Sequence, residues 1–413
     1  MASSSAISLA DLSLFPATPE QVRRSRERTA AEWAKGYTVE QYVQRDVIMD
    51  EHEHAAGGKL ITWVLAPRND PTTLDFMCSC ETFRRTAIIA KRAKEVDARE
   101  VREVTAYAVA SVYTPPHHRR KGYAAHMMRL LHWVLAPRSA LPSTFPAEWG
   151  APPDSEVLRS LGLANAHFSV LYSDVGKQFY QSAGPTPGAN DGWVVKGALE
   201  TTKTIDLTSA PASTSPTPPG LNIQRLTVDD LIALYDHDAV LIKNDLSRFA
   251  GDTSLTLFSF LPNKGVGAYV VRRTLNFTED NSIVLPSAQW GLAILPHGTR
   301  TLQDALRLDS GAPLSFVTWT LDLRVPPRTL VVARLRADKH TFPIILDQLE
   351  VVAREEKVEK VEFWYLRPEL RTIANARGWP TKEREDHLSA VKWYGEEKEE
   401  DVEWVYNEKF CWC

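Results

Sequence analysis

The pattern of apolar and polar positions is clearest between Val104 and Leu135. Residues 104–113 are β-branched, small or aromatic and almost uncharged, which is typical of a strand buried on both faces. Pro115 and Pro116 end this strand, because proline cannot donate to a sheet ladder. From there on, apolar residues recur at the helical period of 3.6 residues, at Ala124, Met127, Met128, Leu131 and Leu135. The pattern therefore predicts a buried strand, a basic loop and an amphipathic helix.

The loop between strand and helix, Arg119–Ala124, has the features of an anion site. A helix start offers unpaired N–H groups and the positive end of the helix dipole, and three cationic side chains precede Gly122. Gly122 and Ala124 are small enough to let main chain approach a phosphate. A solvated basic turn is the alternative, but the buried strand and the apolar helix on either side favour a ligand loop.

The loop sequence Arg119-x-x-Gly122-x-Ala124 resembles the signature of the GCN5-related N-acetyltransferases. A second match follows in the family's order, with a strand at 169–173 and then Phe179-Tyr180-x-x-x-Gly184. The resemblance implies that the loop holds the pyrophosphate of acetyl-CoA and that backbone groups of 111–114 pair with the pantetheine arm and the thioester oxygen. The residues that it implies for binding acetyl-CoA are Val112, Tyr113, Thr114, Arg119, Arg120, Lys121, Gly122, Tyr123 and Ala124.

The rest of the first half fits the same family fold. Thr18-Pro19 and Thr38-Val39 start two helices that cover about 19–50, each with a glutamine in the capping-box position. Strands are predicted at 59–66 and 75–82 around a proline-containing turn, and a further strand at 194–199. Two helices and antiparallel strands that lead into strand, loop, helix and strand indicate an α/β sandwich.

Residues 208–220 are dominated by Pro, Ser, Thr and Ala and are interpreted as a linker. Beyond them the pattern begins again. The expected elements are helices at 227–248 and 343–354, a short helix before Gly378, and strands at 256–260, 267–271, 316–323, 330–335, 361–366 and 403–413. The predicted fold class is α/β: a GCN5-related N-acetyltransferase fold with a mixed, mainly antiparallel sheet flanked by helices in residues 1–207, and a second, degenerate acetyltransferase-like α/β domain in residues 221–413.

In the second domain, residues 336–341 lie where a loop equivalent to Arg119–Ala124 would bind a pyrophosphate. The loop has no glycine and carries Asp338, so we expect it to bind no nucleotide. The domain is expected to shape the cleft of the first domain or to form a partner interface. If the acceptor is a small free amino acid, it needs a closed pocket with paired charges, because it offers little contact area. Its turnover should then require residues 221–413.

Composition limits the other classes of function. The chain has 413 residues, 44% apolar and 24% charged, with a net charge of −4, which gives no reason to expect nucleic acid or a membrane as a partner. Apolar runs fall short of the ~20 residues that span a bilayer. Residues 1–15 lack a basic start and a long apolar core, which argues against secretion. Residues 22–34 leave a mitochondrial presequence open but are better interpreted as the first helix, so a cytoplasmic protein is expected, of undefined oligomeric state.

Four cysteines form two pairs, Cys78-Ser79-Cys80 and Cys411-Trp412-Cys413. On a strand, C-x-C places both thiols on the same face. Zinc with nearby histidines, either 52 and 54 or 117 and 118, is the alternative, but structural zinc pairs usually have two to four intervening residues. Reduced thiols and no metal are therefore expected.

Tyr180 is the candidate general acid. The resemblance implies that a tyrosine on this helix points at the sulfur of CoA, and a phenol with a pKa near 10 can protonate a thiolate without being ionised at pH 7. A buried core tyrosine is the alternative. The match of the surrounding motif favours the catalytic role.

The general base is less well defined by the sequence. Glu81, Glu51, Glu53 and Glu103 are candidates, directly or through water, and residues 107–110 contain no acid. Glu81 is favoured because it lies in an otherwise uncharged strand beside the predicted cleft, where an unpaired carboxylate is costly. Structural pairing with the arginines that follow it, Arg84 or Arg85, is equally compatible with the pattern.

The whole chain resembles the fungal lysine N6-acetyltransferases of lysine catabolism. The segment 79–85, the degenerate second domain and the end Asn407–Cys413 carry this likeness. It implies transfer of acetyl from acetyl-CoA to free L-lysine. A protein-lysine or polyamine acetyltransferase, and a non-catalytic CoA-binding scaffold, stay open as alternatives.

Overall fold

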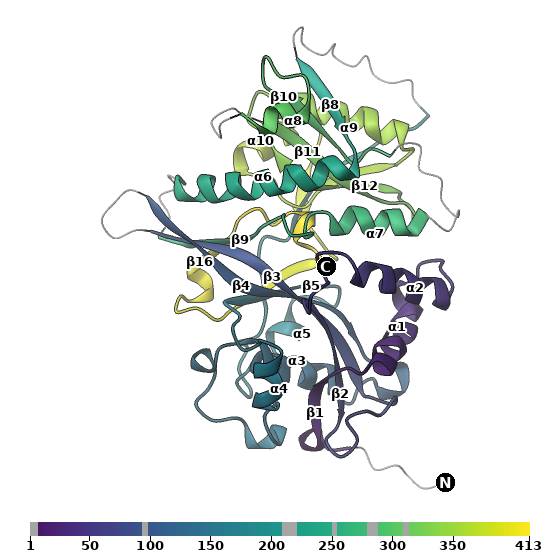
Figure 1. Cartoon of the computed structure of the whole chain (residues 1–413), viewed down its shortest axis with the longest axis vertical. Coiled ribbons are helices and arrows are strands. Elements are labelled where there is room, and N and C mark those ends of the chain that lie inside the picture. The colour runs from purple at the N-terminus through teal and green to yellow at the C-terminus, as the bar shows by residue number, and fades with distance from the viewer. Residues whose placement is uncertain (1–6, 93–97, 209–220, 250–253, 279–287, 309–313) are drawn as a thin grey trace.

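The computed structural model describes residues 7–92, 98–208, 221–249, 254–278, 288–308 and 314–413. Two mixed sheets, each flanked by helices, lie one above the other, and the last part of the chain passes between them (Figure 1). The predicted α/β class, with a mainly antiparallel first sheet followed by a second α/β unit, is confirmed. Within the described residues, every helix is too short or too polar to cross a bilayer.

The first sheet is built mostly from the first half of the chain. Its strands run in the order β1 (Leu12–Pro16), β2 (Leu60–Pro67), β3 (Cys78–Arg92), β4 (Arg99–Tyr113), β5 (Phe168–Ser173), β15 (Leu388–Trp393) and β6 (Val194–Val195), and β9 (Thr256–Phe260) pairs with β3 and with β16 (Val402–Trp404). The helices of this half are α1 (Pro19–Trp33), α2 (Val39–Asp50), α3 (Tyr123–Leu135), α4 (Ser155–Ser160) and α5 (Gln178–Gln181). Both predicted capping boxes are present, at Thr18 and Thr38.

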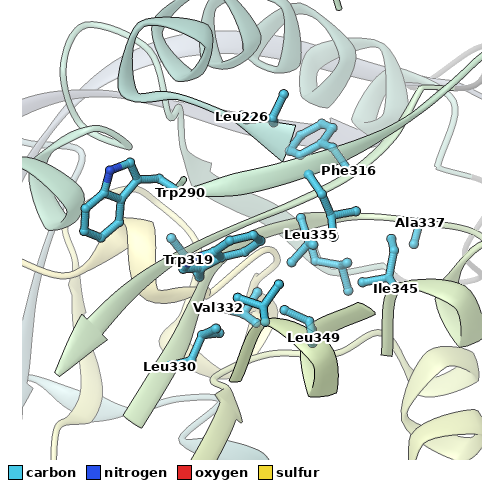
Figure 2. Close-up of a cluster of buried hydrophobic side chains, with 14 of the residues drawn as sticks. Leu226, Trp290, Phe316, Trp319, Leu330, Val332, Leu335, Ala337, Ile345 and Leu349 are labelled. Atoms are coloured by element: carbon cyan, nitrogen blue, oxygen red, sulfur yellow. The ribbon is translucent and has the colours of Figure 1, made fainter. Parts of the chain in front are cut away.

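The second sheet has the order β14 (Thr381–Glu383), β7 (Leu199–Thr204), β13 (Lys360–Phe363), β12 (Thr329–Arg336), β11 (Ser315–Asp322), β10 (Gly291–Leu295) and β8 (Asn222–Leu226). Its helices are α6 (Val228–Ser247), α7 (Tyr269–Thr278), α8 (Leu302–Leu306), α9 (Phe342–Glu355) and α10 (Pro368–Ala376). Figure 2 shows part of the core of this half, where Val332 of β12 lies beside Leu349 of α9, and where Trp319, Leu330 and Ile345 belong to the same buried cluster.

The two sheets exchange strands across the predicted linker. β7 precedes residue 208 yet pairs with β13 and β14 of the second sheet. In the other direction, β9 pairs with β3, and β15 lies between β5 and β6 of the first sheet. The linker itself lies almost entirely outside the described residues. The division into 1–207 and 221–413 stays a prediction, and the two sheets depend on each other for strands.

Three predicted strands are wrong. Residues 194–199 were expected to be one strand, but β6 ends at Val195 in the first sheet and β7 begins at Leu199 in the second. Residues 267–271 were expected to be a strand because they are small and β-branched, but α7 begins at Tyr269 and buries Val270, Val271 and Thr274 on one face. Residues 403–413 were expected to close a sheet. The strand there is the short β16, and a 3-10 turn at Lys409–Cys411 follows it.

Candidate active site

The centre of the site is an irregularity in β4. The pairing of β3 with β4 shifts register between Ser79 and Glu81, and Ser111 has a left-handed backbone with φ of 53°. On its other side, β4 pairs with β5 in parallel as far as Val109 and Leu171. Past this point the backbone of 110–113 no longer follows β5. The two strands therefore open where the pantetheine arm was predicted to lie.

The predicted pyrophosphate loop lies at the start of α3. Gly122 is the N-cap, with φ of 81°, and no side chain caps the helix. A Cβ at Gly122 would meet only Leu9 Cδ1 at 3.8 Å, so the glycine is required by its backbone conformation and not by crowding. The first backbone bond of the helix runs from His126 N to Gly122 O. The three N–H groups before it, at 123–125, belong to the helix start and can face an anion.

Arg119 is turned away from this loop. Its guanidinium donates to Glu32 Oε1 of α1 at 2.7 Å and to the Thr114 carbonyl at 3.0 Å, and it lies over the ring of Tyr113. The side chains of Arg120 and Lys121 are exposed, whereas Tyr123 is buried. The loop fits a pyrophosphate through its backbone, and the contacts predicted for the cationic side chains stay predictions.

A cavity of about 260 Å³ lies beside the opening between β4 and β5. Both halves of the chain line it, because α7 packs between β11 of the second sheet and α2 of the first half, and the C-terminal segment 405–413 lies between the two sheets (Figure 1). Its charged and polar lining includes Glu81, Ser111, Tyr180, Arg273, Asp322 and Lys409. The structure thus brings the two predicted catalytic residues to one cavity, and it adds cations that come from far along the chain.

Glu81 faces this cavity and accepts a hydrogen bond from the Ser111 hydroxyl at 2.7 Å. Burial raises the pKa of the Glu81 carboxyl, and the nearby Arg26 guanidinium offsets this only in part. The alternative of pairing with the following arginines is not what the side chains show, since Arg85 donates to the carbonyls of Cys411 and Trp412 at 2.6 and 3.2 Å. A carboxyl with a raised pKa at the edge of a cavity suits a general base.

The other candidate bases lie elsewhere. Glu103 pairs with Lys243 of α6, and Glu53 lines two other cavities. Glu51 is the exposed C-cap of α2. Of the four carboxylates considered, Glu81 is the one that lines the cavity beside the opening between β4 and β5.

Tyr180 lines the same cavity from α5. Its ring contacts Phe179 and Trp193, with centroid separations of 4.9 and 6.4 Å, so part of the side chain belongs to the core. Burial raises the pKa of the Tyr180 hydroxyl, with a further contribution from Cys78. The phenol therefore stays protonated at neutral pH, as a general acid must.

Comparison with known proteins identifies the fold family. The family model described as "LYC1 GNAT-like C-terminal domain" matches residues 207–413, half of the chain. The chain belongs to this LYC1-like GNAT family. A stretch of 171 residues is 23% identical to the "Lysine acetyltransferase" of Yarrowia lipolytica (strain CLIB 122 / E 150). The matched stretch covers 40% of this chain and 38% of that protein.

Solved structures resemble the chain at low sequence identity. A conserved protein of unknown function from Enterococcus faecalis V583, described as a probable N-acyltransferase, has a TM-score of 0.50 at 9% identity, covering 93% of this chain and 72% of that chain. The GCN5-related N-acetyltransferase from Kribbella flavida has a TM-score of 0.48 at 13% identity, with coverage of 93% and 72%. The first of these likenesses shows a shared fold across both halves of the LYC1-like chain. The predicted resemblance to the GCN5-related superfamily is confirmed.

Among the residues of the LYC1-like cavity that the sequence analysis missed are Arg273, Lys409 and Trp412. Lys409 Nζ lies 4.0 Å from the ring centroid of Trp364 and 3.9 Å from that of Trp412. The guanidinium of Arg273 lies 5.2 Å from the same Trp412 ring. The spacing Lys409-x-x-Trp412 is a faint local signal, whereas nothing around Arg273 in the sequence indicates a site.

The cysteines are all free, and Cys78 and Cys80 are buried on one face of β3, as the C-x-C spacing predicts. His117 and His118 do not meet them. Both imidazoles lie 3.2 Å from Asp75 Oδ1, a geometry that could hold an ion, but Arg28 also donates to this oxygen at 3.4 Å. A guanidinium at the same carboxylate opposes cation binding, so the cluster is interpreted as a hydrogen-bonded anchor between α1 and the turn after β4.

Proposed function

We propose that the protein transfers the acetyl group of acetyl-CoA to the ε-amine of free L-lysine, giving N6-acetyl-L-lysine and CoA, in the cytoplasm as a step of lysine breakdown. The observation that carries the proposal is the cavity shared by Glu81 and Tyr180, which lies at the opening between β4 and β5 and is lined with charge by both halves. The LYC1-like family and the name of the Yarrowia relative support the reaction class.

Binding of acetyl-CoA is assigned to the first half. The helix start at Gly122 directs N–H groups at the pyrophosphate. The backbone of β4 beyond Val109, released from β5, pairs with the pantetheine arm and presents N–H groups to the thioester oxygen. These contacts hold the thioester beside the cavity, so that the acceptor amine attacks from a fixed direction.

Glu81 and Tyr180 carry the proton transfers. Glu81, oriented by Ser111, takes a proton from the ε-ammonium, so that the neutral amine attacks the thioester carbon. The new C–N bond forms as the C–S bond breaks, and Tyr180 gives its proton to the leaving thiolate. The nitrogen, which is cationic after the attack, loses its second proton to restore Tyr180, and the proton held by Glu81 passes to solvent, so that one proton is released per turnover. Neither residue changes its net charge over the cycle.

The second half is assigned a part in acceptor recognition. A cavity of about 260 Å³ with several charged walls suits a small polar molecule better than an extended polypeptide. Deleting residues 221–413 does not test this role by itself, because the deletion also removes β9, β15 and β16 from the first sheet. Point variants in the intact chain are needed.

The test is turnover of acetyl-CoA with mass detection of products, using free L-lysine, a lysine-containing peptide and spermidine. We expect N6-acetyl-L-lysine as the main product. Preferred turnover of the peptide or of spermidine would replace the proposal with a protein or polyamine acetyltransferase. Tight CoA binding without turnover of any amine would indicate a non-catalytic protein.

A further inference from the structure

The second unit has a strand opening like that of the first. β12 and β13 run parallel and stay paired as far as Val332 and Phe363. The strand β4 of the first unit likewise leaves its parallel neighbour β5 after Val109. In each unit the opened strand also shifts register against its antiparallel neighbour, β11 or β3, close to this point. The second unit therefore has the strand geometry that the first is proposed to use for the pantetheine arm.

The C-terminal segment of the chain occupies the second opening. Leu335 lies three residues past the last parallel pair of β12, as Val112 does on β4, and its N–H donates to Glu408 Oε2 at 2.7 Å. A cavity of about 370 Å³ lies here, and Tyr406 and Glu408 of the segment line it together with residues of both strand ends. Backbone N–H groups at this position of the first unit are proposed to face the thioester oxygen. In the second unit the Glu408 carboxylate takes that place.

A buried ion network holds the segment in the opening. Glu408 Oε1 accepts from Arg334 Nη1 at 2.6 Å, and the same guanidinium donates to Asp238 of α6 at 2.7 and 3.2 Å. All three side chains are almost fully buried. Loss of the Glu408 carboxylate would leave part of the Arg334 charge and the Leu335 N–H without a partner in the interior, which is costly.

The residues that follow Glu408 reach the acceptor cavity of the first unit. Lys409 and Trp412 line that cavity, and Lys409 Nζ lies 3.9 Å from the Trp412 ring centroid. Arg85 of β3 donates to the carbonyls of Cys411 and Trp412. Because Lys409 follows Glu408 directly, a shift of Glu408 moves Lys409 with it. One short stretch of chain, which lies between the two sheets (Figure 1), connects the second opening to the acceptor cavity.

We propose that the second opening binds the chain's own C-terminal segment in place of a thioester, and that Glu408 thereby positions Lys409 and Trp412 at the wall of the acceptor cavity. Glu408 is a positioning residue, because it acts through the residues that follow it. The part that concerns the acceptor rests on the proposed function, whereas the binding of the segment does not. The second unit then contributes to acceptor binding through the same kind of opening that the first unit uses for its co-substrate.

The first test measures whether Glu408 holds the segment, through the thiol of Cys411. This thiol is buried in the segment, and those of Cys78 and Cys80 are buried in β3. Iodoacetamide should alkylate Cys411 about 10-fold faster in Glu408→Ala than in the wild type, because the segment loses hydrogen bonds to a charged group and opens more often. Mass spectrometry of the peptides measures the rates. Labelling of Cys78 and Cys80 should stay at the wild-type rate, which shows that the first sheet is intact. Glu408→Gln, whose amide oxygen can still accept from Leu335 N, should lie between the two.

The second test measures acceptor binding. Glu408→Ala should raise KM for L-lysine by about 10-fold, while kcat and the affinity for acetyl-CoA change less than about 3-fold. A merely structural role would lower the active fraction, and therefore kcat, without moving KM. Glu403→Ala is the matched control. Glu403 belongs to β16, just before the segment, and within the described residues its side chain forms no hydrogen bond or ion pair, so the variant should keep wild-type labelling and KM.

Wild-type labelling of Cys411 in Glu408→Ala would overturn the proposal. Faster labelling with an unchanged KM for L-lysine would overturn the positioning role. If Glu408→Ala labels Cys78 and Cys80 faster as well, the variant has unfolded, and Glu408→Gln decides the question by the same criterion of selective labelling at Cys411. If the wild type acetylates no free amine, the proposed function fails instead, and the labelling alone then decides whether the second opening holds the segment.

Discussion

The loops before α3 and before α9 occupy the same place in two similar units. In each unit a strand leads through a loop into a helix and then into a parallel neighbouring strand, β4 to β5 in the first and β12 to β13 in the second. Before α3, Gly122 opens the helix start without a side-chain cap. Before α9, Asp338 Oδ1 accepts from the N–H groups of His340 and Thr341, both at 2.8 Å.

The second loop has therefore placed its own carboxylate where the first is proposed to place a phosphate. Burial opposes this charge, but the hydrogen bonds from Thr341 and His340 lower the pKa of Asp338 below its ordinary value. A helix start binds anions in either case. At the second helix start the protein itself supplies that anion, and the loop also lacks the glycine of the first. The second unit contributes to the cavity through the residues of α7 and of the C-terminal segment that line it.

The largest effect expected is at the first loop. Gly122→Glu should abolish acetyl-CoA binding, a loss of more than about 100-fold, because it places a carboxylate at the helix start and a side chain at a positive φ. Calorimetric titration with acetyl-CoA measures this. Gly298→Glu is the control, since Gly298 also has a positive φ, of 86°, in open space. A folded Gly122→Glu protein that keeps wild-type affinity would contradict the assignment of the loop.

The first loop could be predicted from sequence, whereas the cavity wall could not. The helix α3 and its glycine lie within one continuous stretch, where periodicity and a short motif are read directly. The pairing of β9 with β3 joins Ala87 to Phe260, and no local pattern records such a partner. The same holds for Arg273 and Lys409, whose meeting depends on strand exchange between the sheets. Residues 267–271 were mistaken for a strand because a short apolar run does not distinguish strand from helix.

A smaller loss, of turnover and not of acetyl-CoA binding, is expected when the proton-transfer residues of the first unit are replaced. Tyr180→Phe should lower kcat by about 100-fold with nearly unchanged affinity for acetyl-CoA, because the ring still packs against Trp193 and only the proton donor is lost. Steady-state kinetics with a parallel acetyl-CoA titration separate the two effects. Wild-type turnover in this variant would return Tyr180 to a purely structural role.

Glu81→Gln should also lower kcat by about 100-fold, and it should change the pH dependence of kcat/KM. Glu81 must be ionised to accept a proton, and its raised pKa moves the acidic limb of kcat/KM to a higher pH than an ordinary glutamate would give. In the glutamine variant this limb should disappear. A limb that persists unchanged would assign the base to another group.

The comparison of the two loops also predicts that the loop before α9 contributes to stability through Asp338. Asp338→Ala should lower the free energy of unfolding by about 1 kcal/mol, because the N–H groups of His340 and Thr341 lose their acceptor. Denaturant unfolding measures it, with the exposed neighbour variant Lys339→Ala as a control that should change little. The variant should still not bind acetyl-CoA through this loop, because it lacks the glycine backbone of the first. Binding of acetyl-CoA by the Asp338→Ala protein at this loop would mean that Asp338 alone accounts for the difference between the two loops.

The smallest effect expected comes from Lys409, and it tests whether the second unit contributes to the pocket. The groups that act on this amine are Arg273 and Arg384, which lower its pKa, Glu362 and Asp322, which raise it, and burial, which is the largest influence and lowers it. With a pKa of about 7, Lys409 is charged below this pH and becomes neutral above it. Because Lys409 lines the cavity, its charged form should attract the carboxylate of a bound amino acid. Affinity for N6-acetyl-L-lysine, which has no ionisable ε-amine, should therefore fall as pH rises from about 6 to 8.5.

The fall should be only about 3- to 10-fold, because Arg273 stays charged and the bound carboxylate itself raises the pKa of Lys409. Calorimetry across this range measures it. Lys409→Met should bind more weakly at pH 6 and lose the pH dependence, whereas Lys35→Met, at another lysine of the cavity, should keep it. If the slope survives in Lys409→Met, the titrating group lies elsewhere, and Lys409 has no part in binding the carboxylate.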